Sequence, residues 1–336
     1  MSASPVSTLA PVIRPVRRVV CGLPTSDGAG VKLTRLLGTP ELPDLDPFLL
    51  LDQFGTDRAE DYLAGFPDHP HRGFETVTYM LEGRMRHRDN HGNEGLLVPG
   101  SVQWMSAGSG LVHSEMPEQL DGAMRGFQLW VNLPAKDKMR TPRYQEFAPE
   151  NIPETTPAAG ACVKVIAGRI GEVEGPVRDV AAQPIYFDIR LDAGSDYVQP
   201  LPSGHTAFAC VYAGTTMFGD AATPVAAVNL AVFGPGDAVR MCAGREGARL
   251  ILVAGKPFNE PVARYGPFVM NTRERSCRRS RTFAPDVSDR LDQCVGVAVA
   301  EIGRIAVALC SIIARRVRKY WPASISRPFA KRIRFA

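Results

Sequence analysis

Regularly spaced cysteine pairs are missing from this chain of 336 residues, although it contains seven cysteines. Without a Cys-x-x-Cys pair, the sequence indicates neither a thiolate zinc site nor a disulfide framework. Cys210 and Cys242 lie in apolar, strand-like runs and are expected to be buried, reduced thiols. The N-terminus also lacks the apolar segment and cleavage site of a signal peptide, so the cytoplasm is the default location.

The main part of the chain also lacks a basic surplus, despite a formal net charge of +4. Residues 273–336 hold 15 Lys and Arg against 5 Asp and Glu, which leaves 24 basic and 30 acidic side chains in residues 1–272. A basic nucleic-acid-binding domain is therefore excluded for residues 1–272, and no direct binding of nucleic acid is expected. Any affinity for phosphate or anionic lipid would lie in the tail.

Helical periodicity is scarce, whereas short strand-like runs recur between turn residues. The chain has 31 glycines and 28 prolines, and runs such as GFETVTYMLEG, SVQWMSAG and RGFQLWVNLP follow one another without a helical period. This pattern predicts an all-β sandwich or barrel over residues 74–130 and again over 161–272. The proline-rich residues 134–160 form a linker or a crossing segment, and residues 1–30 form an arm that packs across a neighbouring sheet or stays loose.

Two compact pairs of donor side chains stand out: His69-x-His71 and His113-x-Glu115. Alternate side chains of a strand point to the same face, so each pair can direct both members into one interior. Three imidazoles and one carboxylate suit a mononuclear site for iron, manganese, nickel or zinc. The competing interpretation is a pair of histidines on a solvated strand face, but two such pairs among glycine turns favour the metal site.

The other candidate residues are interpreted as turn, pocket or core residues rather than as metal ligands. His87 and His91 flank a polar hairpin and are expected to be solvated turn residues, with His91-Gly92 supplying the turn. The Ala-Gly-Ser-Gly loop at 107–110 lacks the lysine of a phosphate-binding loop, so it is a turn. Six large apolar side chains could line a pocket or belong to the core: Phe54, Phe74, Met80, Trp104, Met105 and Phe127.

The second half of the chain repeats the first. Pro99-Gly100 and Ala107-Gly108 match Pro235-Gly236 and Ala243-Gly244 at identical spacing. Extended without gaps, this alignment sets Arg249 and Ile251 opposite His113 and Glu115. Alignment on Gly83 and Gly214 sets Pro200 and Pro202 opposite His69 and His71. We therefore expect two similar barrels with metal only in the first, and we expect the nearby His205 to be structural or exposed.

Three segments resemble the pirin family of bicupins: HPHRGFETVTYMLEG, WMSAGSGLVHSE and KPFNEPVARYGPFVMNT. The resemblance runs from about Val12 to Thr272 and implies two tandem, jelly-roll-like cupin barrels. In pirins the four metal ligands stand at the positions of His69, His71, His113 and Glu115. The implied metal is Fe(II), with other divalent transition metals as substitutes.

The resemblance also implies a function. Some pirins oxygenate quercetin to a depside with release of carbon monoxide, and eukaryotic members are nuclear transcription cofactors sensitive to the redox state of the iron. Glu115 would be the anionic ligand and, with Glu75, a candidate catalytic carboxylate. Glu75 stands where other cupins sometimes carry a ligand glutamate. In the more conservative interpretation, Glu75 is a hydrogen-bond partner that orients a histidine. In the alternative interpretation, it is a metal ligand or accepts a proton from the substrate.

Two main functions follow from these expectations. The first is a quercetin 2,3-dioxygenase that uses a flavonol-like substrate and O2. The second is a non-catalytic metal-binding regulator that acts through a protein partner, and a pocket protein without metal is a third. We expect a monomer with a metal-binding barrel over residues 1–145, a barrel without metal over 146–272, and a basic tail over 273–336.

The tail departs from the resemblance after Thr272. Pirins continue into a short acidic helix, typically Thr-Arg-Glu-Glu-Ile-Met-Gln-Ala, whereas this chain continues Arg273, Glu274, Arg275. Codons GAG GAG ATC ATG CAG GC lose one G to become GAG AGA TCA TGC AGG C, which encode the residues found at 274–278. We therefore hypothesise that the chain is out of frame from Arg275 onward. The rival is an evolved extension, in which the apolar run at 295–314 contacts a membrane, although Glu301 and Arg304 oppose this.

The nucleotide sequence tests the frameshift. Restoring one base after the codon for Glu274 should convert the basic tail into an acidic, family-like helix. If no single-base shift does so, the extension is genuine and the frameshift hypothesis fails.

Overall fold

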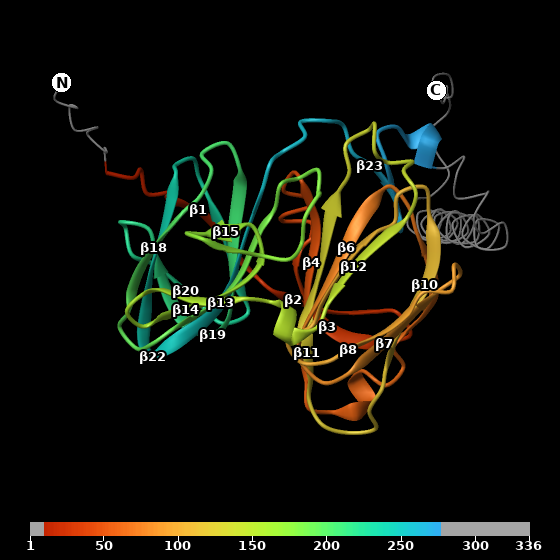
Figure 1. The fold of residues 1–336 in the computed structure, drawn as a ribbon, viewed down its shortest axis with the longest axis horizontal. Coiled ribbons are helices and arrows are strands. Elements are labelled where there is room, and N and C mark those ends of the chain that lie inside the picture. The colour runs from red at the N-terminus through yellow and green to blue at the C-terminus, as the bar shows by residue number, and fades with distance from the viewer. Residues whose placement is uncertain (1–9, 277–336) are drawn as a thin grey trace, which may run out of the picture. The chain divides into compact units, whose positions relative to one another are not determined.

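A computed structural model describes residues 10–276 and shows a chain built almost entirely of β-strands (Figure 1). The described residues contain 24 strands and two short 3-10 helices, η1 (Ala59–Asp61) and η2 (Pro149–Asn151). All pairings between these strands are antiparallel, which suits sequence segments joined by short turns. The predicted all-β architecture with two tandem barrels is confirmed. Of the segment predicted to be out of frame, only Arg275 and Ser276 are described, and the apolar run at 295–314 lies outside the described residues.

The first barrel consists of two facing sheets. The seven-stranded sheet has the order β12-β9-β6-β11-β4-β3-β2, and the four-stranded sheet has the order β5-β10-β7-β8. Their bounds are β2 (Leu23–Asp27), β3 (Val31–Leu37), β4 (Phe48–Thr56), β5 (Phe66–His71), β6 (Phe74–Glu82), β7 (Met85–Asp89), β8 (Glu94–Leu97), β9 (Val102–Ser106), β10 (Leu111–Pro117), β11 (Met124–Asn132) and β12 (Arg143–Phe147).

The second barrel is formed by a nine-stranded sheet with the order β1-β21-β19-β22-β17-β14-β13, in which β18 also pairs with β22 and β20 with β19. Two short hairpins, β15–β16 and β23–β24, complete the described chain. The bounds are β1 (Val16–Cys21), β13 (Glu154–Ala158), β14 (Ala161–Ala167), β15 (Arg169–Ile170), β16 (Val173–Glu174), β17 (Ile185–Leu191), β18 (Asp196–Pro200), β19 (Thr206–Phe218), β20 (Thr223–Ala226), β21 (Asn229–Phe233), β22 (Ala238–Gly255), β23 (Ala263–Tyr265) and β24 (Phe268–Met270).

The two ends of the described chain each join the barrel formed by the other half. Strand β1, from the N-terminal arm, pairs with β21 in the sheet of the second barrel. Near the other end, Phe268 forms a parallel bridge with Arg72 of the first half, and the Val269 amide donates to the Arg72 carbonyl at 3.0 Å. The expectation that the arm packs across a neighbouring sheet is therefore confirmed, whereas the boundaries at residues 145 and 272 stay predictions.

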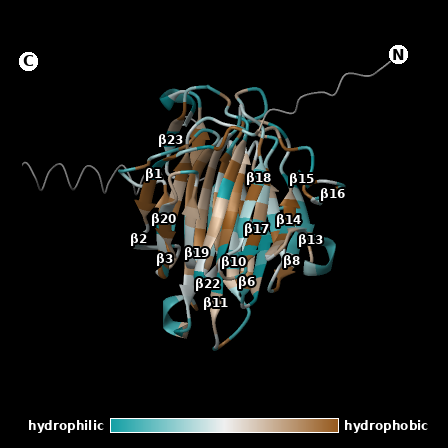
Figure 2. Cartoon of the chain, turned by 90° about the vertical axis from the view of Figure 1, so that its left-hand side faces the viewer, coloured by the Kyte–Doolittle hydropathy of each residue, from teal (hydrophilic) through white to brown (hydrophobic). Residues whose placement is uncertain are grey.

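Strand β6 explains how the barrels pack. All its residues from 74 to 80 are buried, because both faces of the strand are covered. Val77 and Tyr79 join a core cluster with Trp104 from β9 and with Phe208 and Val253 of the second barrel. Met80 points the other way, into a cluster inside the first barrel. Figure 2 shows this hydrophobic character running along the strands, with hydrophilic residues concentrated in the loops.

A half-buried polar contact lies within this interface. The Asp188 carboxylate of the second barrel accepts hydrogen bonds from the hydroxyls of Tyr79 at 2.6 Å and Tyr212 at 2.5 Å. Burial is the main cause that raises the pKa of Asp188, and the two hydroxyl donors partly offset it. A hydrogen bond to a carboxylate stabilises more than one between neutral groups, so Tyr79 links the two barrels specifically.

The expectation of buried, reduced thiols is confirmed for Cys210, whereas Cys242 is only half-buried. Cys21, Cys162, Cys210 and Cys242 are free thiols, with Cys210 buried and Cys242 half-buried. Within residues 10–276, no helix is long and apolar enough to span a membrane.

The interface hydrogen bond generates a stability prediction. Tyr79→Phe should lower the free energy of unfolding by about 0.5–1.5 kcal/mol, because it removes one donor from the half-buried Asp188 carboxylate. Tyr186→Phe is the matched control: this buried hydroxyl belongs to the same cluster and has no partner among the described residues, so its removal should be neutral or stabilising. Urea unfolding measures both variants, and equal losses of stability would contradict the assigned role of Tyr79.

Candidate metal centre

Strand register brings the two donor pairs of the sequence together. Strands β5 and β10 are antiparallel neighbours in which His113 lies opposite His69 and Leu111 lies opposite His71. Burial alternates along β10, so His113 and Glu115 point into the barrel whereas the residues between and beside them are less buried. The spacing of two residues in each pair therefore puts the donors on one face, as the sequence predicted.

Glycine at position 73 allows the chain to close over this end of the barrel. Gly73 follows the first histidine pair with a φ of +83°, and a Cβ placed there would lie 2.0 Å from the Val269 carbonyl oxygen. The buried Lys138 ammonium donates to the carbonyls of Gly73 at 2.8 Å and Val269 at 3.2 Å. These contacts hold the β23–β24 hairpin next to the histidines.

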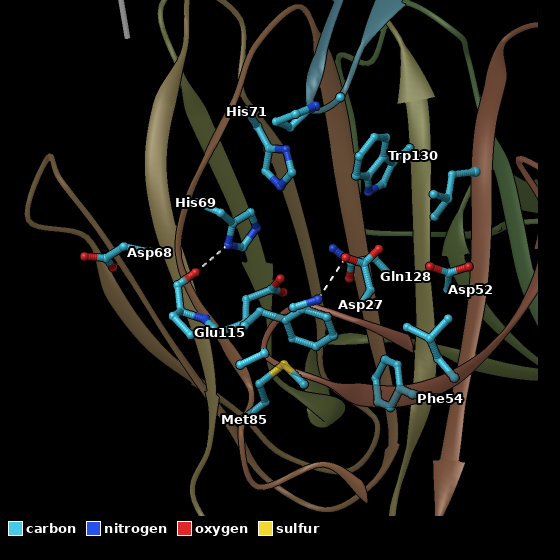
Figure 3. Close-up of a pocket in the computed structure, with 18 of the residues that line it drawn as sticks. Asp27, Asp52, Phe54, Asp68, His69, His71, Met85, Glu115, Gln128 and Trp130 are labelled. Atoms are coloured by element: carbon cyan, nitrogen blue, oxygen red, sulfur yellow. Dashed lines mark hydrogen bonds between the residues drawn. The ribbon is translucent and has the colours of Figure 1, made fainter. Parts of the chain in front are cut away.

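The three imidazoles form one cluster, and two of them, His69 and His71, line the wall of a cavity (Figure 3). One ring nitrogen from each of His69, His71 and His113 lies within 4.8 Å of the others. The ring centroids are 4.4 Å apart for His69 and His113, 4.7 Å for His69 and His71, and 5.0 Å for His71 and His113. Three ring nitrogens at these separations can converge on a single ion.

Burial keeps two of these imidazoles neutral. His71 and His113 are 3% and 1% exposed, and this burial, followed by the neighbouring histidines, lowers the pKa of both imidazoles well below the usual value. A neutral imidazole offers a lone pair to a metal, whereas a protonated one cannot. Both ring nitrogens of His113 and Nδ1 of His71 are buried and have no hydrogen-bond partner in the described part of the chain. Because buried polar atoms are almost always satisfied, these orphaned nitrogens fit a divalent metal ion.

His69 is oriented by the backbone. Its Nδ1 lies 2.8 Å from the Pro67 carbonyl oxygen, which can only accept a hydrogen bond. Nδ1 must therefore carry the proton, which leaves the lone pair on Nε2 for a ligand. Metal-binding histidines commonly donate their other N–H to a carbonyl in this way.

Glu115 lies on the same strand two residues beyond His113 and lines the same cavity. It is 3% exposed, and its Oε1 lies 2.9 Å from the Thr78 hydroxyl. It is outside the group of three donors whose ligand atoms fall within 4.8 Å, and the strand register shifts between His113 and Glu115. Its role as the fourth ligand therefore stays a prediction.

The structure does not bring Glu75 to the histidines. Its carboxylate accepts a hydrogen bond from Trp104 Nε1 at 3.0 Å and pairs with the Arg140 guanidinium. Burial is the main cause that raises its pKa, and Trp104 and Arg140 offset this. Glu75 occupies the face of β6 that carries Val77 and Tyr79, so its contacts support the barrel interface. Its assignment as a catalytic carboxylate receives no support from these contacts.

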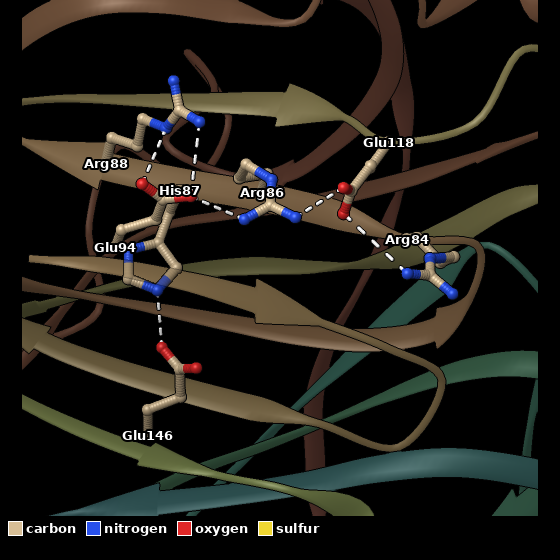
Figure 4. Close-up of polar contacts among 7 residues, drawn as sticks. All are labelled: Arg84, Arg86, His87, Arg88, Glu94, Glu118 and Glu146. Atoms are coloured by element: carbon tan, nitrogen blue, oxygen red, sulfur yellow. Dashed lines mark hydrogen bonds and ion pairs between the residues drawn. The ribbon is translucent and has the colours of Figure 1, made fainter.

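The prediction for His87 is wrong, whereas that for His91 is confirmed. His87 lies within β7, opposite Glu115 on β10, and is 2% exposed. Its Nε2 lies 2.5 Å from Glu146 Oε2 (Figure 4). The alternation of buried Met85 and His87 with more exposed neighbours shows that the strand extends further than predicted, and the hairpin turn begins after it. His91 is an exposed turn residue.

The opposite face of β7 carries charged pairs at the surface. Arg86 pairs with Glu94 at 2.6 Å and with Glu118 at 2.5 Å, and Arg88 pairs with Glu94 at 3.1 Å (Figure 4). Such exposed pairs contribute little to stability individually. They do confirm that strand alternation, rather than a loop, determines which way His87 points.

The cavity beside the histidines has a volume of about 560 Å³ and a largely apolar wall. Among the six apolar residues proposed for a pocket, only Phe54 lines it. Trp104 and Phe127 instead belong to the core between the barrels. The sequence analysis missed Trp130 and Arg264, which do line the cavity. Arg264 comes from β23, so only knowledge of the long-range contact could have placed it there.

The second barrel contains apolar side chains where the first has its donors. Its interior holds a cluster that includes Val163, Phe187, Leu250 and Leu252. The gapless match of the repeat is wrong on this strand. Arg249 and Ile251 lie on the part of β22 that pairs with β17 and β19, as β11 pairs with β4 and β6, whereas β10 pairs with β5 and β7. The gapless alignment therefore matched two different strands, and Ile251 packs in the core between the barrels. His205 is half-buried and contacts the Gln183 carbonyl at 3.0 Å, which confirms a structural role.

Comparisons with known proteins cover both barrels. The Pirin family profile matches residues 30–131, and the profile of the Pirin C-terminal cupin domain matches residues 186–280. A pirin-like protein of Caulobacter vibrioides is 55% identical over 263 residues, which are 78% of this chain and 94% of that protein. The relative therefore extends over both barrels.

Solved structures agree with this assignment. The crystal structure of quercetin 2,3-dioxygenase from Acinetobacter baumannii matches with a TM-score of 0.75 and 29% identity, over 81% of this chain and 97% of the other. A bacterial pirin from Escherichia coli in complex with nickel(II) shares the fold, with a TM-score of 0.56 and 19% identity over 71% of this chain and 98% of the other.

The imidazole cluster generates a prediction about metal content. His113→Ala should reduce bound divalent metal at least tenfold, because it removes one donor and opens the buried site to water. His91→Ala is the control, since this exposed histidine lies outside the cluster. Metal analysis after dialysis measures both, with circular dichroism to show that each variant is folded. Undiminished metal in His113→Ala would place the ion elsewhere.

Proposed function

This chain belongs to the pirin family of cupin proteins, and we propose that it is a metal-dependent dioxygenase that cleaves a flavonol such as quercetin with O2. The observation that carries this proposal is the cluster of buried histidines with unsatisfied ring nitrogens beside an apolar cavity. The cavity volume of about 560 Å³ lies in the range of sites for small organic ligands. The similarity to a solved quercetin 2,3-dioxygenase supports the substrate class.

We assign His69, His71 and His113 as neutral ligands and Glu115 as the anionic ligand of one Fe(II) ion. Four ligands leave an octahedral ion up to two open positions. A bound divalent ion would supply a Lewis acid that makes the flavonol 3-hydroxyl more acidic and orients the substrate. Nickel remains an alternative metal, since the similar Escherichia coli pirin was solved with nickel(II).

The residues of the chain determine the remaining properties of the site. The Pro67 carbonyl holds the His69 proton on Nδ1, and the Thr78 hydroxyl lies within hydrogen-bond distance of Glu115. Phe54, Phe66 and Met85 line the cavity and would exclude water from a bound aromatic ligand. A dry cavity strengthens the electrostatic effect of the ion on the substrate hydroxyl.

A non-catalytic regulator is the second candidate function. The charged face of β7, with Arg86 and Arg88 paired to glutamates, lies on the same strand as the buried His87 and next to β10. A protein partner on that face would be adjacent to the strand that carries His113 and Glu115. This function requires metal binding but no turnover. Under both functions we propose a cytoplasmic monomer.

Oxygen consumption separates the two functions. The full-length protein, loaded with Fe(II) under nitrogen and assayed for metal, should consume one O2 and release one carbon monoxide for each quercetin cleaved. The products are the depside and carbon monoxide, which together contain all atoms of quercetin and O2. Protein with confirmed iron occupancy that consumes no oxygen would contradict the dioxygenase and favour the regulator.

A further inference from the structure

The cavity contains a cation contributed by the other half of the chain. Arg264 belongs to β23, near the end of the described residues, and lines the cavity together with His69 and His71. The hairpin that carries it is anchored by the contacts of Pro267 and Val269 with Arg72. Arg264 is therefore held at the cavity by a fixed hairpin, although its own side chain is accessible to solvent.

One face of the Arg264 guanidinium is fixed by Trp130. The guanidinium carbon lies 4.6 Å from the Trp130 ring centroid, which is a favourable cation–π arrangement. Trp130 in turn packs edge-to-face against His71, with ring centroids 5.3 Å apart. These two separations place the guanidinium carbon at most about 10 Å from the His71 ring. A single aromatic ligand can therefore reach both the histidine cluster and Arg264.

The donor groups of Arg264 are largely unused. Within residues 10–276, its guanidinium makes long contacts of 3.4 Å with the carbonyls of Gly266 and Leu49. Among the residues at 10–276, no carboxylate lies within 4.0 Å of its nitrogens. An arginine offers five N–H donors in a planar fork that matches a carboxylate, so most of this capacity remains for a ligand.

Asp52, a carboxylate in the same cavity that could pair with Arg264, is already paired with another arginine. Asp52 is 3% exposed, and both of its oxygens bind Arg35, at 2.8 and 2.7 Å. Arg35 also pairs with Asp27 at 2.9 Å. Since Asp52 is committed to Arg35, it leaves Arg264 as the accessible cation on this wall of the cavity.

We propose that Arg264 is a substrate-binding residue that selects planar aromatic ligands bearing an anionic oxygen group opposite their metal-chelating oxygens. The chelating end would meet the histidine cluster, and a carboxylate or an ionised phenol at the other end would pair with the guanidinium fork. Leu50, Phe54 and Trp130 would contact the rings between these two ends. This inference rests on the proposed ligand cavity, but it adds a preference for charge that the dioxygenase function does not require.

Two matched probes test the inference without turnover. Calorimetric titration of the full-length, Fe(II)-loaded protein under nitrogen should compare 3-hydroxyflavone-4′-carboxylate with its methyl ester, which has the same rings without the charge. We expect the wild type to bind the carboxylate about fivefold or more tightly than the ester, because the pair forms at a partly solvated cavity mouth. Raising the ionic strength from about 0.05 to 0.5 M should weaken this preference.

Variants identify the residue responsible. Arg264→Gln should bring the ratio of the two dissociation constants to about one, and Arg264→Lys should retain part of the preference because it keeps the charge but loses the fork. Arg240→Gln is the matched control: this exposed arginine pairs with Asp196 in the second barrel, so its variant should keep the wild-type ratio. Metal content and binding of the ester show that each variant is intact.

The outcomes separate this inference from the proposed function. Equal binding of both probes by the wild type, or a preference that survives in Arg264→Gln, overturns the inference while the dioxygenase proposal stands on its oxygen assay. A charge preference that depends on Arg264 in a protein that consumes no oxygen supports the inference and refutes the dioxygenase. Failure of the wild type to bind either probe overturns the inference and its cavity together.

Discussion

Burial of imidazole nitrogens without protein partners is the constraint on which the rest of the site depends. His71 and His113 are almost inaccessible, and three of their ring nitrogens have no hydrogen-bond partner among residues 10–276. Protonation does not satisfy them, because burial lowers the pKa of both rings. A divalent cation satisfies several such nitrogens at once, since it accepts lone pairs from neutral rings. The histidine cluster is therefore better explained as a metal site than as a structural core.

Each barrel receives a terminal segment from the other half of the chain, so the site in the first barrel depends on residues from both halves. Strand β1 completes the sheet of the second barrel, whereas the β23–β24 hairpin lies against the first barrel at Arg72. Gly73 permits this close approach, and Lys138 fixes it through the carbonyls on both sides. The hairpin that follows the second barrel thus contributes to the cavity wall, whereas the interior of that barrel is filled with apolar side chains. The second barrel can therefore lack metal ligands while the hairpin that follows it still supports the site in the first barrel.

The sequence predicted the features that follow from the alternation of side chains along a strand. It did not predict the features that depend on strand register or on long-range contacts. The β-strands, the repeat and the convergence of His69, His71 and His113 follow from strand periodicity and from short motifs. His87 was misplaced because the end of β7 is set by its pairing with β10, which no local pattern reveals. Arg249 and Ile251 were matched to His113 and Glu115 because a gapless alignment set β10 against a different strand, the part of β22 that pairs with β17 and β19. Arg264 reaches the cavity only through the hairpin that crosses to the first barrel.

The central claim is that one metal ion is bound by the histidines of the first barrel. X-ray absorption spectroscopy of the iron-loaded protein tests it most directly, because the extended fine structure reports the ligand atoms themselves. The account predicts one ion per chain, with three imidazole ligands at about 2.0–2.2 Å and oxygen atoms completing the coordination. A spectrum with fewer than two imidazoles, or with sulfur ligands, would contradict the claim.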